Sequence, residues 1–194
     1  EENPITMNPF RIQREELNVE KIGFLKNLIM LIWKGSNGEV SKTEDRLIEQ
    51  VITEYYEAYF VGFKGYSASQ RDALHKKFLI ETATQGSATD TNEEVEARIN
   101  KRIKEMEDRR KALKVKELSF NSFYEYSTQR IPYICNENKI AGIDISTYNY
   151  MLMDFYRGGS HERTLNENLD STLFDETFIV FEIDTIKDDP LLFP

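Results

Sequence analysis

Residues 41–60, SKTEDRLIEQVITEYYEAYF, carry the clearest helix signal in this chain of 194 residues. Ser41 is followed three residues later by Glu44, which is the spacing of a capping box, where each side chain binds the other residue's backbone amide. Apolar residues then recur with the period of one helix face. They are Leu47, Ile48, Val51, Ile52, Tyr55, Tyr56, Tyr59 and Phe60. The pattern predicts a helix whose tyrosine-rich face packs in a core with its hydroxyls reaching the surface, and it disfavours a platform for stacking bases.

Five more segments have helical periodicity and recognisable start signals. They are residues 18–35, 65–81, 92–113, 119–135 and 144–159. Pro132 should kink or end the helix that contains it, and Gly158 with Gly159 should end the last one. Residues 82–92, TATQGSATDTN, are rich in Gly, Ser and Thr and read as a mobile linker.

Composition limits the classes of function. The chain has 25 Lys and Arg against 34 Asp and Glu, a net charge of −9, so a chain-wide electrostatic hold on DNA or RNA is not expected. The single cysteine, Cys135, excludes an internal disulfide framework and suits a reducing cytosol as a small buried hydrophobe. The longest apolar run, residues 28–33, is far shorter than the roughly 20 residues that span a bilayer. A cytoplasmic chain without a membrane span is expected.

The sequence contains no motif that carries chemistry. No Gly-x-x-x-x-Gly-Lys-Ser/Thr phosphate loop and no Gly-x-Ser-x-Gly elbow occurs. His75 and His161 are far apart and cannot form a usual zinc site with one cysteine. We therefore predict no catalytic, cofactor-binding or metal-ligating residue in this chain.

One segment has the pattern of an interaction helix. In residues 92–113 a thin apolar seam of Val95, Ile99, Ile103 and Met106 runs along a charged rod. One hypothesis is a protruding helix that docks a partner through basic side chains. These are Arg98, Lys101, Arg102, Arg109 and Arg110. The alternative, favoured because acids are interleaved throughout, is a solvated outer helix with charge pairs at i, i+4.

The end of the chain has a different character. Residues 177–184, TFIVFEID, are apolar on both faces, as in a central strand covered by helices. Asp188-Asp189-Pro190 then reads as a helix start. We expect this strand to pair with the extended N-terminal segment or with another copy of the chain.

The predicted fold is mainly α: an all-α subdomain of about six helices with a minor β element formed by the terminal segments. Residues 1–17 are an extended stub, residues 18–163 form the all-α subdomain, and residues 164–194 hold the returning strand and a truncated helix start. The chain then reads as a helical block between two pieces of an α/β nucleotide-binding domain, interrupted at both ends; the family resemblance described next implies that this domain is a RecA-like ATPase domain.

Several segments resemble one family. They are MNPFRI (residues 7–12), REELNVEKIGFLKNLIMLIWKG (14–35), TEDRLIEQVITEYYEAYF (43–60), KVKELSFNSFYEYS (114–127), RIPYIC (130–135) and LFDETFIVFEIDTIKDDPLLFP (173–194). They resemble the TraG conjugation ATPase of conjugative transposons. The resemblance implies a hexameric cytoplasmic ATPase, peripheral at the inner membrane, that powers conjugative DNA transfer and type IV secretion. It also implies that the phosphate loop precedes Asn8-Pro9-Phe10 and that the magnesium-binding strand follows residues 177–184.

By this resemblance ATP and Mg²⁺ belong to the intact parent, and this fragment binds neither. Its expected role is that of a non-catalytic helical subdomain that contacts other copies of the ATPase or the secretion channel proteins. One alternative is that Arg157 or Arg163 reaches the ATP site of a neighbouring subunit. Another is a stand-alone helical module that binds an unrelated protein.

Overall fold

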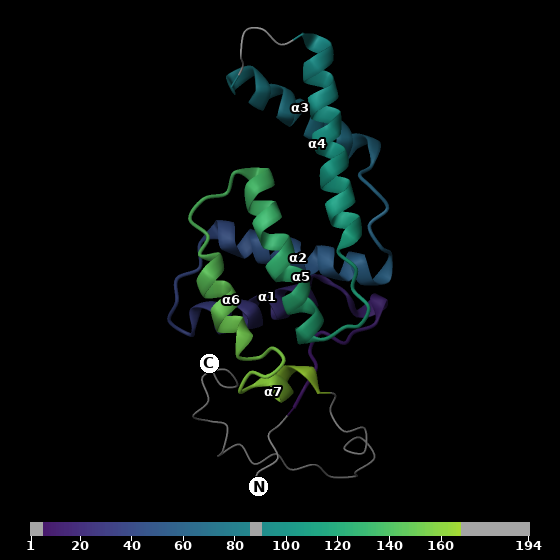
Figure 1. Cartoon of the computed structure of the whole chain (residues 1–194). Helices are drawn as coiled ribbons and strands as arrows, with labels where there is room; N and C mark the ends of the chain where they lie inside the picture. The colour runs from purple at the N-terminus through teal and green to yellow at the C-terminus, as the bar shows by residue number, and fades with distance from the viewer. Residues whose placement is uncertain (1–5, 86–90, 168–194) are drawn as a thin grey trace. The chain divides into compact units, whose positions relative to one another are not determined.

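The computed structural model describes residues 6–85 and 91–167, which form helices joined by irregular segments (Figure 1). In chain order they are the 3₁₀ helix η1 (Arg14–Glu16) and the α-helices α1 (Val19–Lys34), α2 (Lys42–Phe60), α3 (Ala68–Gln85), α4 (Asn92–Ala112), α5 (Phe120–Asn138), α6 (Ile145–Met153) and α7 (Glu162–Asn166). The mainly α prediction is confirmed, and these ranges contain no strand. The predicted strand 177–184, and with it the minor β element, lies outside the described residues.

The chain divides into two compact units. Unit 1 comprises Glu1–Phe60 and Val115–Pro194, and unit 2 comprises Val61–Lys114. Unit 2 contains α3 and α4, whereas the other helices belong to unit 1. The segment 18–163, predicted as one subdomain, thus contributes to both units.

Unit 1 is a helical bundle built around α2 and α5. Helix α1 packs against α2 and α6, and α5 packs against α2, α6 and α7. The residues that fill its centre are fully or almost fully buried, as expected for large apolar and aromatic side chains. The largest of them are Phe10, Leu25, Ile29, Leu47, Ile48, Ile52, Tyr55, Tyr56, Phe120, Phe123 and Tyr148. Trp33 of α1 meets Tyr148 of α6 edge to face at 5.2 Å.

The helices begin where the cap signals predict. At the starts of α1 to α6 a side-chain oxygen accepts a hydrogen bond from a backbone amide that has no partner inside the helix. The pairs are Asn18 with Lys21, Ser41 with Glu44, Ser67 with Gln70, Thr91 with Glu94, Ser119 with Ser122, and Asp144 with Thr147. Glu44 also accepts from the Ser41 amide, so the predicted capping box is confirmed.

Three predicted helix boundaries differ from the structure. Helix α5 continues through Pro132 to Asn138, because buried Ile131, Ile134 and Cys135 hold its far end in the core. Helix α6 ends at Met153, five residues before Gly158. After Met153, hydrogen bonds between residues three apart replace the α-helical bonds between residues four apart. Helix α3 extends to Gln85, so the first residues of the predicted linker 82–92 are helical.

The tyrosine face of α2 is a core face, as predicted, but two of its hydroxyls do not reach the surface. Tyr55 and Tyr56 are completely buried. The Tyr56 hydroxyl donates to the carbonyl of Phe10 at 2.9 Å, and the Tyr55 hydroxyl lies 2.7 Å from the Ser122 hydroxyl. Burial raises the pKa of both tyrosines. Buried partners made by chain segments far along the sequence therefore replace water at these hydroxyls.

Cys135 is a free, buried thiol, as expected of a small hydrophobe. Burial raises the pKa of this thiol, and a raised pKa keeps a cysteine in its unreactive protonated form.

Candidate functional site

The predicted interaction helix is α4, one of the two helices of unit 2. Its apolar seam packs against α3 in a small core that consists of Phe78, Ile99, Ile103 and Met106, with Tyr66, Leu74 and Val95 partly buried beside it. The seam predicted from the periodicity of residues 92–113 is therefore confirmed as a packing face. What remains for a partner is the charged surface on either side of that seam.

The buried carboxylate of Glu107 joins the beginning of α3 to the end of α4. It is 4% exposed, and its two oxygens accept hydrogen bonds of 2.8 and 2.7 Å from Nη2 of Arg71. Oε1 also accepts from the backbone amide of Tyr66 at 2.9 Å. A carboxylate that is buried must have such partners, because removal from water otherwise costs several kcal/mol.

Gly65 allows this close approach. Its φ is +115°, a conformation that residues with a Cβ rarely adopt. A Cβ at this position would lie 3.4 Å from Oε1 of Glu107, an ordinary van der Waals distance, so the backbone conformation and not the space favours glycine. The glycine therefore lets the chain turn into α3 directly beside the carboxylate.

Arg102 and Arg110, two of the predicted contact residues, pack against aromatic rings of unit 2. The guanidinium of Arg102 lies 3.8 Å from the centre of the Phe78 ring, and its Nη1 lies 3.0 Å from Oε2 of Glu81. The guanidinium of Arg110 lies 4.3 Å from the centre of the Phe63 ring. Cation–π contacts and ion pairs of this kind hold the arginines against the two-helix core.

The other three predicted contact residues are exposed. They are Arg98, Lys101 and Arg109. Spacings of four and seven residues place Arg98, Arg102 and Arg109 along the same side of α4. Arg110 follows Arg109 directly, so it points from the helix in another direction. The structure thus brings three of the five together along one face and separates Arg110 from them.

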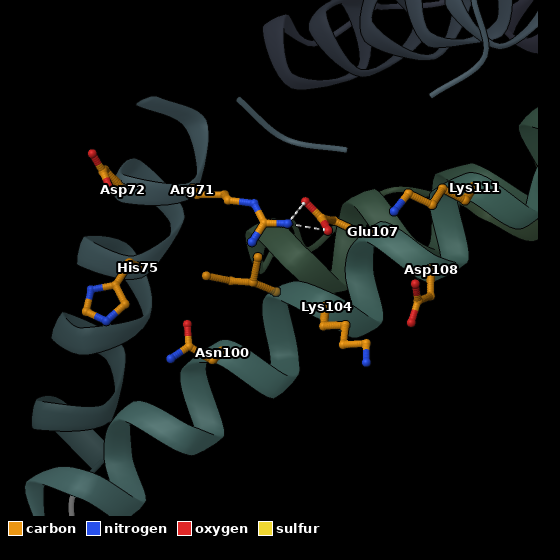
Figure 2. A pocket seen from close by; sticks show the side chains of 9 residues that line it. Arg71, Asp72, His75, Asn100, Lys104, Glu107, Asp108 and Lys111 are labelled. Atoms are coloured by element: carbon orange, nitrogen blue, oxygen red, sulfur yellow. Dashed lines mark hydrogen bonds and ion pairs between the residues drawn. The ribbon is translucent and has the colours of Figure 1, made fainter. Parts of the chain in front are cut away.

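A groove of about 400 Å³ lies between α3 and α4 (Figure 2). Figure 2 shows the Arg71–Glu107 ion pair bridging the two helices there. The groove is lined by Arg71, Asp72, His75, Asn100, Ile103, Lys104, Glu107, Asp108 and Lys111. Its charges are mixed, with three acidic and three basic side chains besides the histidine. None of the five predicted contact residues lines it.

The groove residues were missed by sequence reasoning because they belong to two helices that the linker separates. Glu107 gave one usable signal, since it directly follows the seam residue Met106 and lies four residues after Ile103. That position borders the apolar face, where an acid must find a partner on the neighbouring helix. His75 is about one-third exposed, and its Nε2 lies 2.6 Å from Oε2 of Glu96 on α4.

The local charge of unit 2 is opposite to that of the whole chain. Residues 61–114 contain twelve Lys and Arg against nine Asp and Glu, a net charge of +3, whereas the chain carries −9. Unit 2 is therefore the part of the chain with the greater electrostatic attraction to acidic surfaces.

A second charged group, buried in unit 1, joins α2 to α5. Nε of Arg130 lies 2.6 Å from Oε2 of Glu54, and its Nη1 lies 3.3 Å from both oxygens of Glu137. Gln50 donates to the other oxygen of Glu54 at 2.9 Å. Burial disfavours the charged guanidinium, but the two carboxylates outweigh burial and raise the pKa of Arg130. The cluster is a structural link that holds two helices in register.

The two arginines considered for a neighbouring ATP site are both exposed and belong to unit 1. Nη2 of Arg157 lies 3.4 Å from Oε1 of Glu125, and Nε of Arg163 lies 2.5 Å from Oε1 of Glu167. Exposed ion pairs of this type contribute little to stability. Both guanidinium groups can therefore exchange these carboxylates for another anion at small cost.

Unit 1 also has a polar cleft of about 740 Å³ where its N-terminal segment meets the beginning of α5. Its walls include Asn8, Tyr59, Lys116, Asn121 and Asn166. Oδ1 of Asn121 is buried and has no hydrogen-bond partner in the described part of the chain.

Residues 6–85 and 91–167 have neither the features of a metal site nor those of a membrane span. These residues contain no group of three or more His, Cys, Asp or Glu side chains placed to hold a metal ion. None of the helices described there is both long enough and apolar enough to cross a membrane.

Comparison with known proteins gives a family. Searches of curated proteins and of solved structures returned no match. The family model of the TraG P-loop domain matches residues 1–66 and 59–194, which together span the chain. Because this match extends over the helices of both units, the chain belongs to the TraG P-loop domain family.

Proposed function

We propose that this chain is a non-catalytic helical subdomain of a cytoplasmic ATPase that powers conjugative DNA transfer through a type IV secretion system. The observation that carries the proposal is the match of the TraG P-loop domain model along the chain. The sequence itself has no Gly-x-x-x-x-Gly-Lys-Ser/Thr phosphate loop. The intact ATPase then binds ATP and Mg²⁺ with residues outside this chain, and the helical subdomain binds neither.

The proposed role of the subdomain is protein contact, either with other copies of the ATPase in a hexamer or with proteins of the secretion channel. Unit 2 is the better candidate for this contact. It has a small core of two helices, exposed basic residues on α4, and a net charge of +3. Such a surface favours acidic protein partners through electrostatic steering.

A second candidate function places Arg157 or Arg163 at the ATP site of a neighbouring subunit. The observation that favours it is the exposure of both side chains, 57% for Arg157 and 66% for Arg163. An arginine supplied by a neighbour can neutralise charge that develops on transferring phosphate.

ATP binding to the chain tests the main proposal. Isothermal titration calorimetry with ATP and Mg²⁺ should give no saturable binding up to about 1 mM, the weak end of ordinary affinities. Micromolar affinity would show that the chain has its own nucleotide site and would overturn the proposal. The intact ATPase is the positive control.

Steady-state ATP hydrolysis by the intact protein tests the second candidate. If an arginine acts in a neighbouring site, Arg157→Ala or Arg163→Ala should lower kcat by about 10³-fold or more while ATP still binds. Exposed Arg14 in η1 provides the control substitution Arg14→Ala. Equal kcat values in all three variants would exclude this role and leave the main proposal intact.

A further inference from the structure

Two segments far apart in the sequence meet at one edge of unit 1. The backbone amide of Met7 donates to the carbonyl of Thr164 in α7 at 2.9 Å. In Figure 1 the purple N-terminal segment accordingly passes beside α7. Residues 7 and 164, which are far apart in the sequence, are thus neighbours in unit 1.

The side chain of Asn8 binds residues 7–12, here called the entering segment, to the residues just before α5. Its Nδ2 donates to the carbonyl of Leu118 at 2.9 Å, and its Oδ1 accepts from the amide of Phe10 at 3.2 Å. The side chain therefore uses both its donor and its acceptor. Leu118 lies two residues before the first residue of α5, so the bond reaches the beginning of that helix.

Phe10 fixes the same segment from inside the core. It is completely buried, and its ring stacks on Phe123 of α5 with a centroid distance of 4.9 Å. Its carbonyl accepts the hydroxyl of Tyr56 from α2 at 2.9 Å. The backbone at residue 10 thus cannot move without displacing side chains of both α2 and α5, because a packed core leaves no free space.

Asn166 connects α7 to the same turn of α5. Its Oδ1 accepts from the amide of Asn121 at 2.8 Å. Its Nδ2 donates to the carbonyls of Phe155 at 3.0 Å and Glu162 at 2.7 Å. The entering segment (residues 7–12) and α7 therefore both bind the beginning of α5, at Leu118 and Asn121.

We propose that residues 7–12 and α7 form a coupling junction that transmits movement of the flanking ATPase domain to α5, with Asn8 and Asn166 as its positioning residues. This inference rests on the proposed function, because it requires a nucleotide-dependent movement in the domain that the subdomain joins. Movement at α5 extends to α2 through the Arg130–Glu54 ion pair. The helical bundle then responds as one body.

Hydrogen–deuterium exchange of the chain itself is the first test. Asn8→Ala removes both bonds of the side chain, while Asn8→Asp has the same shape but loses the donor to Leu118. In both variants the amide hydrogens of residues 119–123 should exchange about five- to thirtyfold faster than in the wild type. This factor corresponds to a loss of about 1–2 kcal/mol in the free energy of opening. Arg14→Ala, at an exposed position in η1 just after this segment, should leave these rates unchanged. Faster exchange confined to residues 7–10 would overturn the proposal.

A double-mutant cycle shows whether Asn8 and Asn166 act together as one junction or independently of each other. Asn8→Ala and Asn166→Ala should be non-additive in their effects on exchange at residues 119–123, because both act through one turn of α5. Additive effects would show that the two asparagines act separately and would overturn the junction.

The second test uses the intact ATPase. Adding ATP with Mg²⁺ to the wild-type protein should change exchange at the beginning of α5, and Asn8→Ala should abolish that change while ATP turnover continues. A wild-type protein without the change, or a variant that keeps it, would overturn the coupling junction. Neither result concerns nucleotide binding by the isolated chain, so failure of this inference is distinguishable from failure of the proposed function.

Discussion

Nη2 of Arg71, in the first turn of α3, donates to both carboxylate oxygens of Glu107, in the last turns of α4, at 2.8 and 2.7 Å. Glu107 is buried whereas Arg71 is more than half exposed. The carboxylate therefore depends on this partner and on the Tyr66 amide, while the arginine retains contact with water. Because unit 2 has a small apolar core, the loss of this contact should lower the stability of both of its helices.

Glu107→Gln should destabilise unit 2 selectively. The amide keeps the side-chain volume but loses the charge that holds Arg71 and replaces one acceptor with a donor. We expect a loss of about 1–3 kcal/mol in the free energy of local opening, measured by hydrogen exchange at residues 66–71. Exposed Glu105, on the same helix, provides the control Glu105→Gln, which should change little. Equal exchange in the two variants would contradict a structural role for Glu107.

Arg130→Met should strongly destabilise unit 1. Glu54 and Glu137 would remain buried without their cation, and breaking a buried pair in this way costs about 3–5 kcal/mol. Urea unfolding followed by circular dichroism measures the loss. Replacing all three residues by methionine should recover most of it, since the uncompensated charges are then gone. Exposed Arg46 on α2 provides the control Arg46→Met, expected within about 0.5 kcal/mol of the wild type.

Glu44 should make stability depend on acid pH. Burial favours its neutral form, but the ammonium of Lys34 at 2.6 Å and the hydrogen bonds from Ser41 outweigh burial and lower the pKa of Glu44 below its ordinary value of 4.5. A lowered folded-state pKa contributes stability that is fully present above pH 4.5 and is lost as the pH falls through the folded-state value.

The measurement for Glu44 is the free energy of unfolding between neutral and acid pH. Glu44→Gln should be less stable than the wild type at neutral pH, and the difference should shrink in acid as the wild-type carboxylate becomes protonated. Glu39→Gln, at an exposed position, is the matched control. A difference that stays constant with pH would show that the charge of Glu44 contributes nothing.

Tyr55→Phe should destabilise unit 1, whereas Tyr59→Phe should not. The Tyr55 hydroxyl accepts from the Ser119 amide at 3.2 Å and pairs with the Ser122 hydroxyl at 2.7 Å, so its removal leaves buried polar groups without that partner. The expected cost is about 1–3 kcal/mol in urea unfolding. Tyr59 belongs to the same helix and is 39% exposed, which makes it a matched control. Equal stability of the two variants would contradict the assignment of the buried hydroxyl.

The part of the structure that sequence patterns predicted best is local. Capping at Ser41, Thr91 and Asp144 was predictable because a side chain and an amide three residues apart meet as soon as one helical turn forms. The seam of α4 was predictable because its period matches the helix. Pro132 shows the limit of such rules, since packing of Ile131 and Ile134 continues α5 beyond a residue that disfavours a helix.

The candidate sites were predicted less completely. In the sequence, Arg98, Lys101 and Arg109 lie off the apolar seam of α4. That position is enough to predict that their side chains are exposed. The contact of Arg102 with Phe78, by contrast, depends on how α3 crosses α4. The five-residue interaction face remains a prediction.

The sequence by itself determined that residues 6–85 and 91–167 are mainly helical, where those helices begin, and which family the motifs resemble, because periodicity and caps act within a few residues. Only the tertiary structure decided that Glu107 binds Arg71, that Arg130 lies between Glu54 and Glu137, and that Asn8 and Asn166 meet at α5. Apart from Arg130 and Glu137, which lie two turns apart on α5, each of these contacts joins residues that no local rule relates. Their partners follow from the way buried helices pack, which also sets the cost of leaving a charge or an amide unpaired.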